Sequence, residues 1–168
     1  NVVVIRDDPD TVVDRIKVVD PTRVSVRKLW HSFTPELYAQ WPAPLVDRFI
    51  RTQPKRNEPS GADLEAILAE SHVLFCGFPF PQFLVGRMPE LRWAHWGFAG
   101  ISNLNGSDFW ASDILSTSSR GYSAPWPIAE SSLAAVFMFS RKLHLAVRQT
   151  IQKEFPVPPY EGAMLIQD

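Results

Sequence analysis

The sequence contains a single cysteine, Cys76. An internal disulfide framework is therefore excluded, and this cysteine usage is typical of a reducing compartment, so we expect a cytoplasmic location. The four histidines and Cys76 show none of the spacings by which zinc ligands are recognised, and no metal site is predicted. A small thiol at the end of an apolar run is expected to be buried and unreactive.

Charge of one sign is also lacking. Lysine and arginine number 17 and aspartate and glutamate 18, which gives a formal net charge of -1. Nucleic acid and anionic membranes attract proteins with a basic excess, so neither is predicted as a partner. The longest nearly uncharged apolar stretch, residues 125–140, is too short and too mixed to cross a bilayer, and no charged leader with an apolar segment opens the chain. Metabolites and other proteins remain as partner classes.

Sequence repeats are absent, whereas proline is abundant, with 15 residues among 168. A chain of this length favours one domain that is large enough to bury a core. The prolines in residues 34–44 and 53–59 predict loops between elements. Residues 155–160 cannot be helical for the same reason, so we expect them to separate a helix from the next unit of the chain.

Apolar runs alternate along the chain with segments of helical periodicity, which predicts an α/β layer fold. Residues 2–5, Val-Val-Val-Ile, are closed by charged residues and have the pattern of a central parallel strand buried on both faces. Further strands are expected at 24–29, 73–76 and 92–96, with one more beginning at 114–115, and helices at 44–52, after the N-cap segment 60–63, and at about 126–152.

The strand expected at 92–96 ends in Gly-Phe-Ala-Gly, residues 97–100. Small residues let the chain turn tightly and let an anion approach several successive backbone N–H groups. We therefore predict that the amides of Phe98, Ala99 and Gly100 can bind a carboxylate. A plain connection between strand and helix is the alternative interpretation of this turn.

A second loop, Phe78-Pro79-Phe80-Pro81, follows the strand expected at 73–76. Open α/β sheets place ligand-binding loops after the carboxyl ends of their strands, so Phe78 and Phe80 are predicted to form an apolar wall of the same site. The alternative is a rigid aromatic loop that only packs against the core.

None of the histidines is assigned a catalytic role. His95 lies inside the strand at 92–96 and is expected to be packed and hydrogen-bonded. His144 follows two cationic residues in the helical segment 126–152, where a structural or surface role is expected. His31 and His72 have no carboxylate at a suggestive spacing.

Asp7 and Asp8 follow the first strand, where an acidic pair could hold magnesium in a phosphoacceptor receiver domain. Such a domain also needs an acceptor aspartate at the end of a later central strand. Residues 73–77 offer only Cys76 there, which disfavours this class.

Three segments in the middle of the chain follow one another in an informative order. Leu91-Arg92-Trp93 leads through Ala99-Gly100-Ile101 to Leu104, residues 114–121 contain a short strand and Ser-Arg-Gly, and residues 124–134 contain Pro-Ile-Ala-Glu. In order and spacing they resemble the strand, Ala-Gly substrate loop, Ser-Arg-Gly turn and inter-domain helix of the D-isomer-specific 2-hydroxyacid dehydrogenases. Ser102 and Asn103 depart from the family's pattern, and the amino-terminal third matches only in its strand-helix rhythm.

The resemblance implies a flavodoxin-like three-layer domain that faces a Rossmann domain binding NAD or NADP, with hydride passing between nicotinamide and C2 of a small 2-hydroxy or 2-oxo acid. The family's Gly-x-Gly-x-x-Gly fingerprint has no counterpart in the chain. Its catalytic arginine, glutamate and histidine would also lie outside, so no catalytic residue is assigned. We expect a fragment that binds no cofactor and turns over no substrate by itself, with both ends cut.

On this interpretation, residues 1–115 form the substrate-binding domain, residues 116–154 a hinge and a long inter-domain helix, and residues 155–168 a proline-rich tail leading toward the missing Rossmann domain. Residues 133–139 are apolar nearly all round the helix, which predicts a homodimer or a helix-swapped oligomer through residues 126–152. The alternative is a stand-alone, non-catalytic flavodoxin-like module that binds a ligand or a protein.

Overall fold

The computed structural model describes residues 1–7, 10–50, 58–122 and 125–164. The chain divides into two compact units, Asn1–Ser123 and Ala124–Asp168, each of which is described by itself. The boundary predicted after residue 115 falls inside the last strand of unit 1, Leu115–Ser118.

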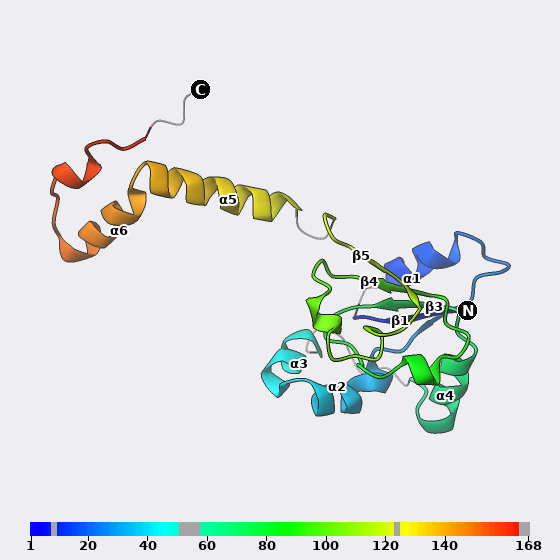
Figure 1. Cartoon of the computed structure of the whole chain (residues 1–168). Helices are drawn as coiled ribbons and strands as arrows, with labels where there is room; N and C mark the ends of the chain where they lie inside the picture. Colours follow the sequence, from blue (N-terminus) through cyan, green and yellow to red (C-terminus); the bar gives the residue numbers. More distant parts are fainter. Residues whose placement is uncertain (8–9, 51–57, 123–124, 165–168) are drawn as a thin grey trace. The chain divides into compact units, whose positions relative to one another are not determined.

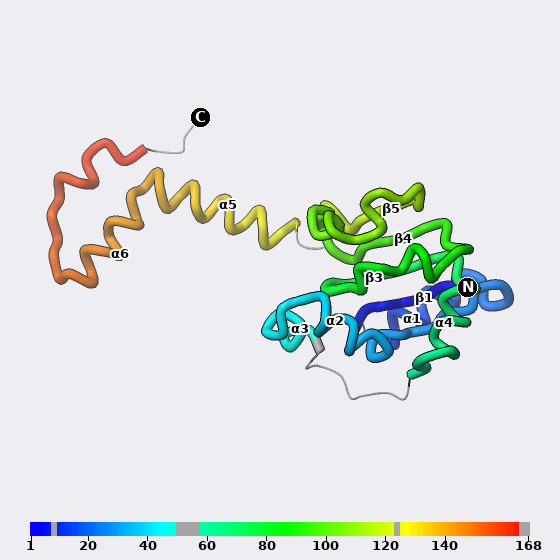
Figure 2. The backbone as a smooth tube through the Cα atoms, turned by 60° about the horizontal axis from the view of Figure 1, so that its bottom comes forward, coloured from blue at the N-terminus to red at the C-terminus, as the bar shows by residue number. Residues whose placement is uncertain are grey.

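Unit 1 is built on a five-stranded, wholly parallel sheet with the order β2-β1-β3-β4-β5. Figure 2 shows β1, β3, β4 and β5 side by side in this order. The interior position of β1 and the edge position of β2 confirm the sequence interpretation. The strands are β1 (Val2–Ile5), β2 (Val26–Lys28), β3 (Val73–Cys76), β4 (Trp93–Trp96) and β5 (Leu115–Ser118).

Helices cover both faces of this sheet. α1 (Asp10–Lys17) lies on one side, and α2 (Thr34–Gln40), α3 (Ala43–Ile50) and α4 (Gly61–Ala69) lie on the other (Figure 1). Successive side chains of a strand point to opposite faces, so each strand contributes to two cores. The structure is therefore a flavodoxin-like three-layer α/β fold, as predicted.

The core on the side of α2, α3 and α4 is the larger one. Its strand side chains are fully buried and pack against Trp30, Phe33 and the loop that carries Phe80. Burying a large apolar side chain contributes about 1.5–3 kcal/mol, so this core supplies most of the stability of unit 1. Its strand and helix members include Val3, Ile5, Leu74, Cys76, Ala94, Trp96, Leu37, Val46, Leu64 and Leu68. The smaller core beneath α1 contains Val4, Val13 and Val26.

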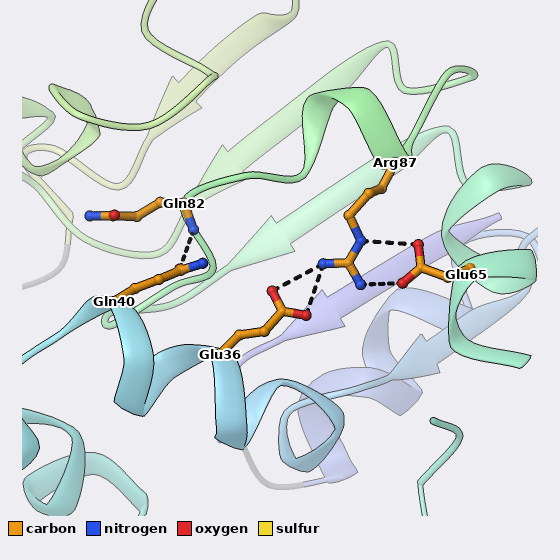
Figure 3. Close-up of polar contacts among 5 residues, drawn as sticks. All are labelled: Glu36, Gln40, Glu65, Gln82 and Arg87. Carbon is orange, nitrogen blue, oxygen red and sulfur yellow. Dashed lines mark hydrogen bonds and ion pairs between the residues drawn. The ribbon is translucent and has the colours of Figure 1, made fainter. Parts of the chain in front are cut away.

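Arg87 joins three elements on the outer side of the larger core, as Figure 3 shows. Its Nε donates to Glu65 Oε2 of α4 at 3.0 Å, and its Nη1 donates to Glu36 Oε1 of α2 at 2.9 Å. The guanidinium also lies over the ring of Phe33, with Cζ 5.3 Å from the ring centroid. The hydrogen bond from Arg87 lowers the pKa of Glu65. One cation thus neutralises two carboxylates that would otherwise repel each other.

The interpretation of residues 34–44 as a loop was wrong, because residues 34–40 form α2. Proline opposes a helix only in its interior, and Pro35 lies in the first turn, where its missing N–H would have no intrahelical partner. α1 also had no counterpart among the predicted helices. The predicted helix at 44–52 appears as α3, whose expected last two residues lie outside the described residues, as do residues 53–57 of the second predicted loop.

Unit 2 contains two α-helices where the sequence predicted a single helix over 126–152. The prediction that residues 155–160 cannot be helical was wrong in part, because η4 (Pro158–Tyr160) is a short 3-10 helix with proline at its start, where no intrahelical N–H is needed. α5 (Pro125–Ser140) and α6 (Leu143–Gln152) are separated by Lys142, whose φ of 55° is left-handed and stops the first helix. Lys142 Nζ donates to the carbonyl of Glu161 at 2.7 Å, which fixes the junction. No helix in the described part of the chain has the length and apolarity needed to cross a membrane.

Candidate functional site

A cavity of about 480 Å³ lies at the carboxyl ends of β1, β3 and β4. From β1 the chain continues to β2, which lies on one side of β1 in the sheet, whereas from β3 it continues to β4, which lies in the opposite direction. The loops that follow β1 and β3 therefore lead away from each other. In open parallel sheets this topological switch point is where ligands bind. The cavity is lined by Arg6, Asp7, Trp30, Arg48, Phe49, Gly77, Phe78, Gly97, Phe98, Gly100 and Asn103.

Arg6 is the first residue after β1, and two glycines make room for its side chain. A Cβ atom built at Gly77 would lie 2.7 Å from Arg6 Cγ, and one built at Gly97 would meet the guanidinium itself. The guanidinium carbon is 5.6 Å from the centroid of the Phe75 ring, a cation–π distance. The residues that follow β3 and β4 are therefore glycines, since any side chain at these two positions would collide with Arg6.

The turn at residues 98–100, for which the sequence predicts a carboxylate site, follows β4; Phe98 and Gly100 line the cavity, whereas Ala99 is not among its lining residues. The amides of Gly77 and Gly97 continue the sheet, donating to Ile5 at 2.9 Å and to Cys76 at 2.8 Å. Within the described residues, no backbone hydrogen bond is donated by residues 98, 99 or 100. These amides are the donors that a carboxylate at this edge of the sheet would use.

The predicted aromatic wall has an outer and an inner part. Phe78 and Phe98 line the cavity, with their ring centroids 5.9 Å apart and their planes at 75°. Phe80 lies behind them, fully buried, and stacks on Phe98 at 5.8 Å and 16°. Phe80 therefore acts on a ligand only through the rings in front of it, whereas Phe49 of α3 adds a ring that the sequence interpretation did not include.

Trp30 is a lining residue of the cavity. The side chain is 2% exposed, and its indole N–H is buried without a hydrogen-bond partner in the described part of the chain. An unsatisfied buried donor costs about 1–3 kcal/mol, and such groups in folded proteins are often satisfied by water or a ligand.

The charges at the cavity favour an anion. Arg6 and Arg48 line it together with one carboxylate, Asp7, so two positive charges face one negative charge and the sum is +1. Guanidinium groups match carboxylates in shape and bind them through paired N–H donors. This electrostatic feature was missed at the sequence level, because Arg6 was interpreted only as the end of the first strand.

His95 lies on the α1 side of β4, packed and hydrogen-bonded as predicted. Its Nδ1 is 2.8 Å from Thr117 Oγ1 of β5, and its Nε2 is 3.2 Å from the Oγ of Ser119, the residue after β5, so both ring nitrogens have a hydroxyl partner. Burial lowers the pKa of His95, and the positive charge of Arg6 lowers it further. A second, apolar cavity of about 690 Å³ on this face is lined by residues of α1, β1, β3 and β4, His95 among them.

Cys76 is fully buried, and burial raises the pKa of its thiol, in agreement with an unreactive structural cysteine. No cluster of three or more histidine, cysteine, aspartate or glutamate side chains among the described residues could hold a metal ion. Asp8 of the pair considered for magnesium lies outside the described residues.

No protein-family model matches the sequence, and no curated protein matches it either. Among solved structures, the chain is similar to a D-lactate dehydrogenase from Aquifex aeolicus that was crystallised with NAD and lactic acid. The two share 15% sequence identity with a TM-score of 0.46, and the alignment covers 94% of this chain and 39% of that one. The chain thus spans well under half the length of that enzyme.

Proposed function

We propose that unit 1 is the substrate-binding half of an NAD- or NADP-dependent D-2-hydroxyacid dehydrogenase, and that its cavity binds a small 2-hydroxy or 2-oxo acid. The observation that carries the proposal is that Phe98 and Gly100 of the turn line one cavity at the switch point together with two arginines, Arg6 and Arg48. The resemblance of residues 91–134 to that family supplies the reaction class.

The residues have separate roles in this proposal. The amides of Phe98, Ala99 and Gly100 donate to the carboxylate, and Arg6, held between its two glycines, supplies a fixed positive charge. Phe78 limits the space beside the carboxylate, with Phe80 behind it. Binding and orientation are the whole contribution of this unit, because the groups that move the proton belong to the other half of the enzyme.

Cofactor binding is assigned to a part of the protein outside these 168 residues, since the chain carries no Gly-x-Gly-x-x-Gly segment. The bound nicotinamide would exchange a hydride with C2 of the acid. The chain alone is therefore expected to bind the acid and to leave NADH unoxidised. The same residues joined to a nucleotide-binding domain should reduce the 2-oxo acid with NADH.

Isothermal titration calorimetry of the purified chain with D-lactate and pyruvate tests the binding step. Arg48→Gln should weaken binding about tenfold or more, because a charge-assisted hydrogen bond contributes about 1.5–3 kcal/mol. Arg92→Gln is the matched control, since Arg92 is an equally exposed arginine of unit 1 that does not line the cavity. Equal effects of the two substitutions would refute the assignment of the carboxylate site.

The alternative, a non-catalytic flavodoxin-like binding module, makes a different prediction for the whole polypeptide. Acid binding with the same Arg48 dependence would persist, but no 2-oxo acid would stimulate NADH oxidation. Measuring the loss of NADH absorbance with the whole polypeptide therefore separates a dehydrogenase from a binding module.

α5 supplies the evidence for a protein partner. Its described side chains include no buried residue, and Leu133, Phe137 and Phe139 are 58%, 49% and 65% exposed. A patch of several hundred Å² of this kind marks an interface, and we assign it to a homodimer or a helix-swapped oligomer through residues 126–152. Sedimentation velocity should show a mass that rises with concentration and returns to the monomer in Leu133→Lys/Phe137→Lys; a constant monomer mass for the unmodified chain would contradict this assignment.

A further inference from the structure

The cavity at the switch point is larger and more aromatic than a three-carbon acid requires. Its volume of about 480 Å³ is room for about 16 water molecules at ~30 Å³ each. Resting on the function proposed above, we propose that the acid bound here carries an aromatic side group, so that the ligand belongs to the aryl-lactate and aryl-pyruvate class.

The aromatic side of the cavity is a continuous series of rings. Phe49 meets Phe78 at 5.9 Å with the planes at 88°, and Phe78 meets Phe98 at 5.9 Å and 75°. All three rings line the cavity together with Trp30. Edge-to-face contacts at these distances are the arrangement that aromatic rings prefer, and a ligand ring would extend the same series.

Buried neighbours hold this aromatic surface in place. Trp41 packs against Phe78 with the centroids 5.0 Å apart, and its indole Nε1 donates to the carbonyl of Phe80 at 2.7 Å. Phe80 in turn stacks on Phe98. Because the rings behind the wall are packed and hydrogen-bonded, the wall is preformed, and little conformational entropy is lost when a ligand ring binds.

The same cavity also provides the polar groups that an acid needs. Arg6, Arg48 and the amides of the turn at residues 98–100 serve the carboxylate, while Asn103 can hydrogen-bond the oxygen on C2. A ligand with a carboxylate at one end and an aryl group at the other uses both kinds of lining. A short aliphatic acid would leave the aromatic rings facing water.

The test compares three acids on the purified chain: D-lactate, D-2-hydroxyisocaproate and D-phenyllactate, titrated by calorimetry. Burial of the phenyl group should make D-phenyllactate bind about 30-fold more tightly than D-lactate. D-Phenyllactate should also bind about threefold to tenfold more tightly than D-2-hydroxyisocaproate, because only the phenyl group makes ring–ring contacts. In a heteronuclear NMR spectrum, D-phenyllactate should shift the indole N–H signal of Trp30, assigned with Trp30→Phe, and leave that of the exposed Trp110 in place.

Phe49→Ala and Phe83→Ala form a matched pair for the aromatic wall. Both side chains are exposed, at 37% and 55%, so both variants should fold, but only Phe49 lines the cavity. Phe49→Ala should weaken D-phenyllactate binding about fivefold to tenfold, a larger factor than any loss of D-lactate binding in the same variant. Phe83→Ala should change neither affinity.

The outcomes separate this inference from the function on which it rests. If D-lactate binds as tightly as D-phenyllactate, with the same loss in Arg48→Gln, the acid site stands and the aryl preference is refuted. If D-2-hydroxyisocaproate equals D-phenyllactate, the cavity selects size and the aryl preference is also refuted. If none of the three acids binds, the acid-binding function fails, and this inference fails with it.

Discussion

The Arg87 network offers the sharpest test of how unit 1 is held together. We consider Arg87→Met, which keeps most of the apolar stem and removes every N–H donor. The Arg87 side chain is 24% exposed, and the two carboxylates that it joins, Glu36 and Glu65, are 33% and 50% exposed. The substitution therefore leaves two neighbouring negative charges without their shared cation (Figure 3).

The expected loss of stability follows from these exposures. Exposed ion pairs contribute roughly 0–1 kcal/mol, and solvent screens the half-exposed Glu65 in this way. Glu36 is more buried and accepts two hydrogen bonds from one nitrogen, at 2.9 and 3.0 Å, so its share lies at the upper end of that range. Together the two pairs give about 1–2 kcal/mol, which corresponds to a decrease of about 2–8 °C in the melting temperature.

Urea unfolding followed by circular dichroism measures this loss, with Glu90→Gln, an exposed carboxylate outside the network, as the control. The pKa of Glu65 is lowered from 4.5 by Arg87, so the pair stabilises the folded state above that pH and stops doing so as the pH falls through the folded-state pKa. The difference between Arg87→Met and the unmodified chain should therefore shrink as the pH is lowered further and further below 4.5. If the two proteins differed in free energy of unfolding by the same amount at neutral and acid pH, the electrostatic explanation would be refuted. The loss of stability would then be attributed to the packing of the Arg87 side chain.

Two further predictions concern the site. Gly77→Ala should destabilise unit 1 by about 1–3 kcal/mol in urea unfolding, because the new methyl group meets the stem of Arg6. Gly97→Ala should mainly displace the guanidinium and weaken acid binding in calorimetry. Gly86→Ala is the control, since Gly86 has open space around it and does not line the cavity, and equal effects at all three positions would contradict the position of Arg6 over the two glycines. Because the pKa of His95 is lowered in the folded state, His95 is protonated first in the unfolded state as the pH falls below about 6.5. The free energy of unfolding should therefore decrease from pH 7 to pH 5, and it should decrease less in His95→Gln. Parallel pH profiles of the two proteins would show that His95 does not contribute.

Much of the sheet could be predicted because its strands are short, apolar and closed by charged residues or glycine. The runs at 2–5 and 73–76 need no knowledge of tertiary contacts, since a parallel strand covered on both faces is apolar throughout. The helix over 34–40 could not be predicted in the same way. Its proline was interpreted as a breaker, although its position in the first turn made it compatible with a helix.

The candidate site was predictable only in the loops that follow strands. Phe78, Phe98 and Gly100 were found because they follow apolar runs directly. Arg48 and Phe49 come from α3, and only the folded chain brings them to the ends of β1, β3 and β4. Arg6 could have been found, since the first residue after an interior parallel strand lies at the edge of the sheet where ligands bind.

The strand order also determines when the protein can fold during its synthesis. β1 is made first but lies between β2 and β3, so its second neighbour is complete only when Cys76 has been added. At about 5–20 residues per second, the ribosome needs roughly 4–14 s to make the intervening chain. During that interval an apolar Val-Val-Val-Ile segment has at least one free edge, and both edges are free until β2 has been made; a free edge is a template for pairing with another nascent chain. The protein should therefore depend on the speed of translation, and on chaperones that bind nascent chains, more than its final packing indicates.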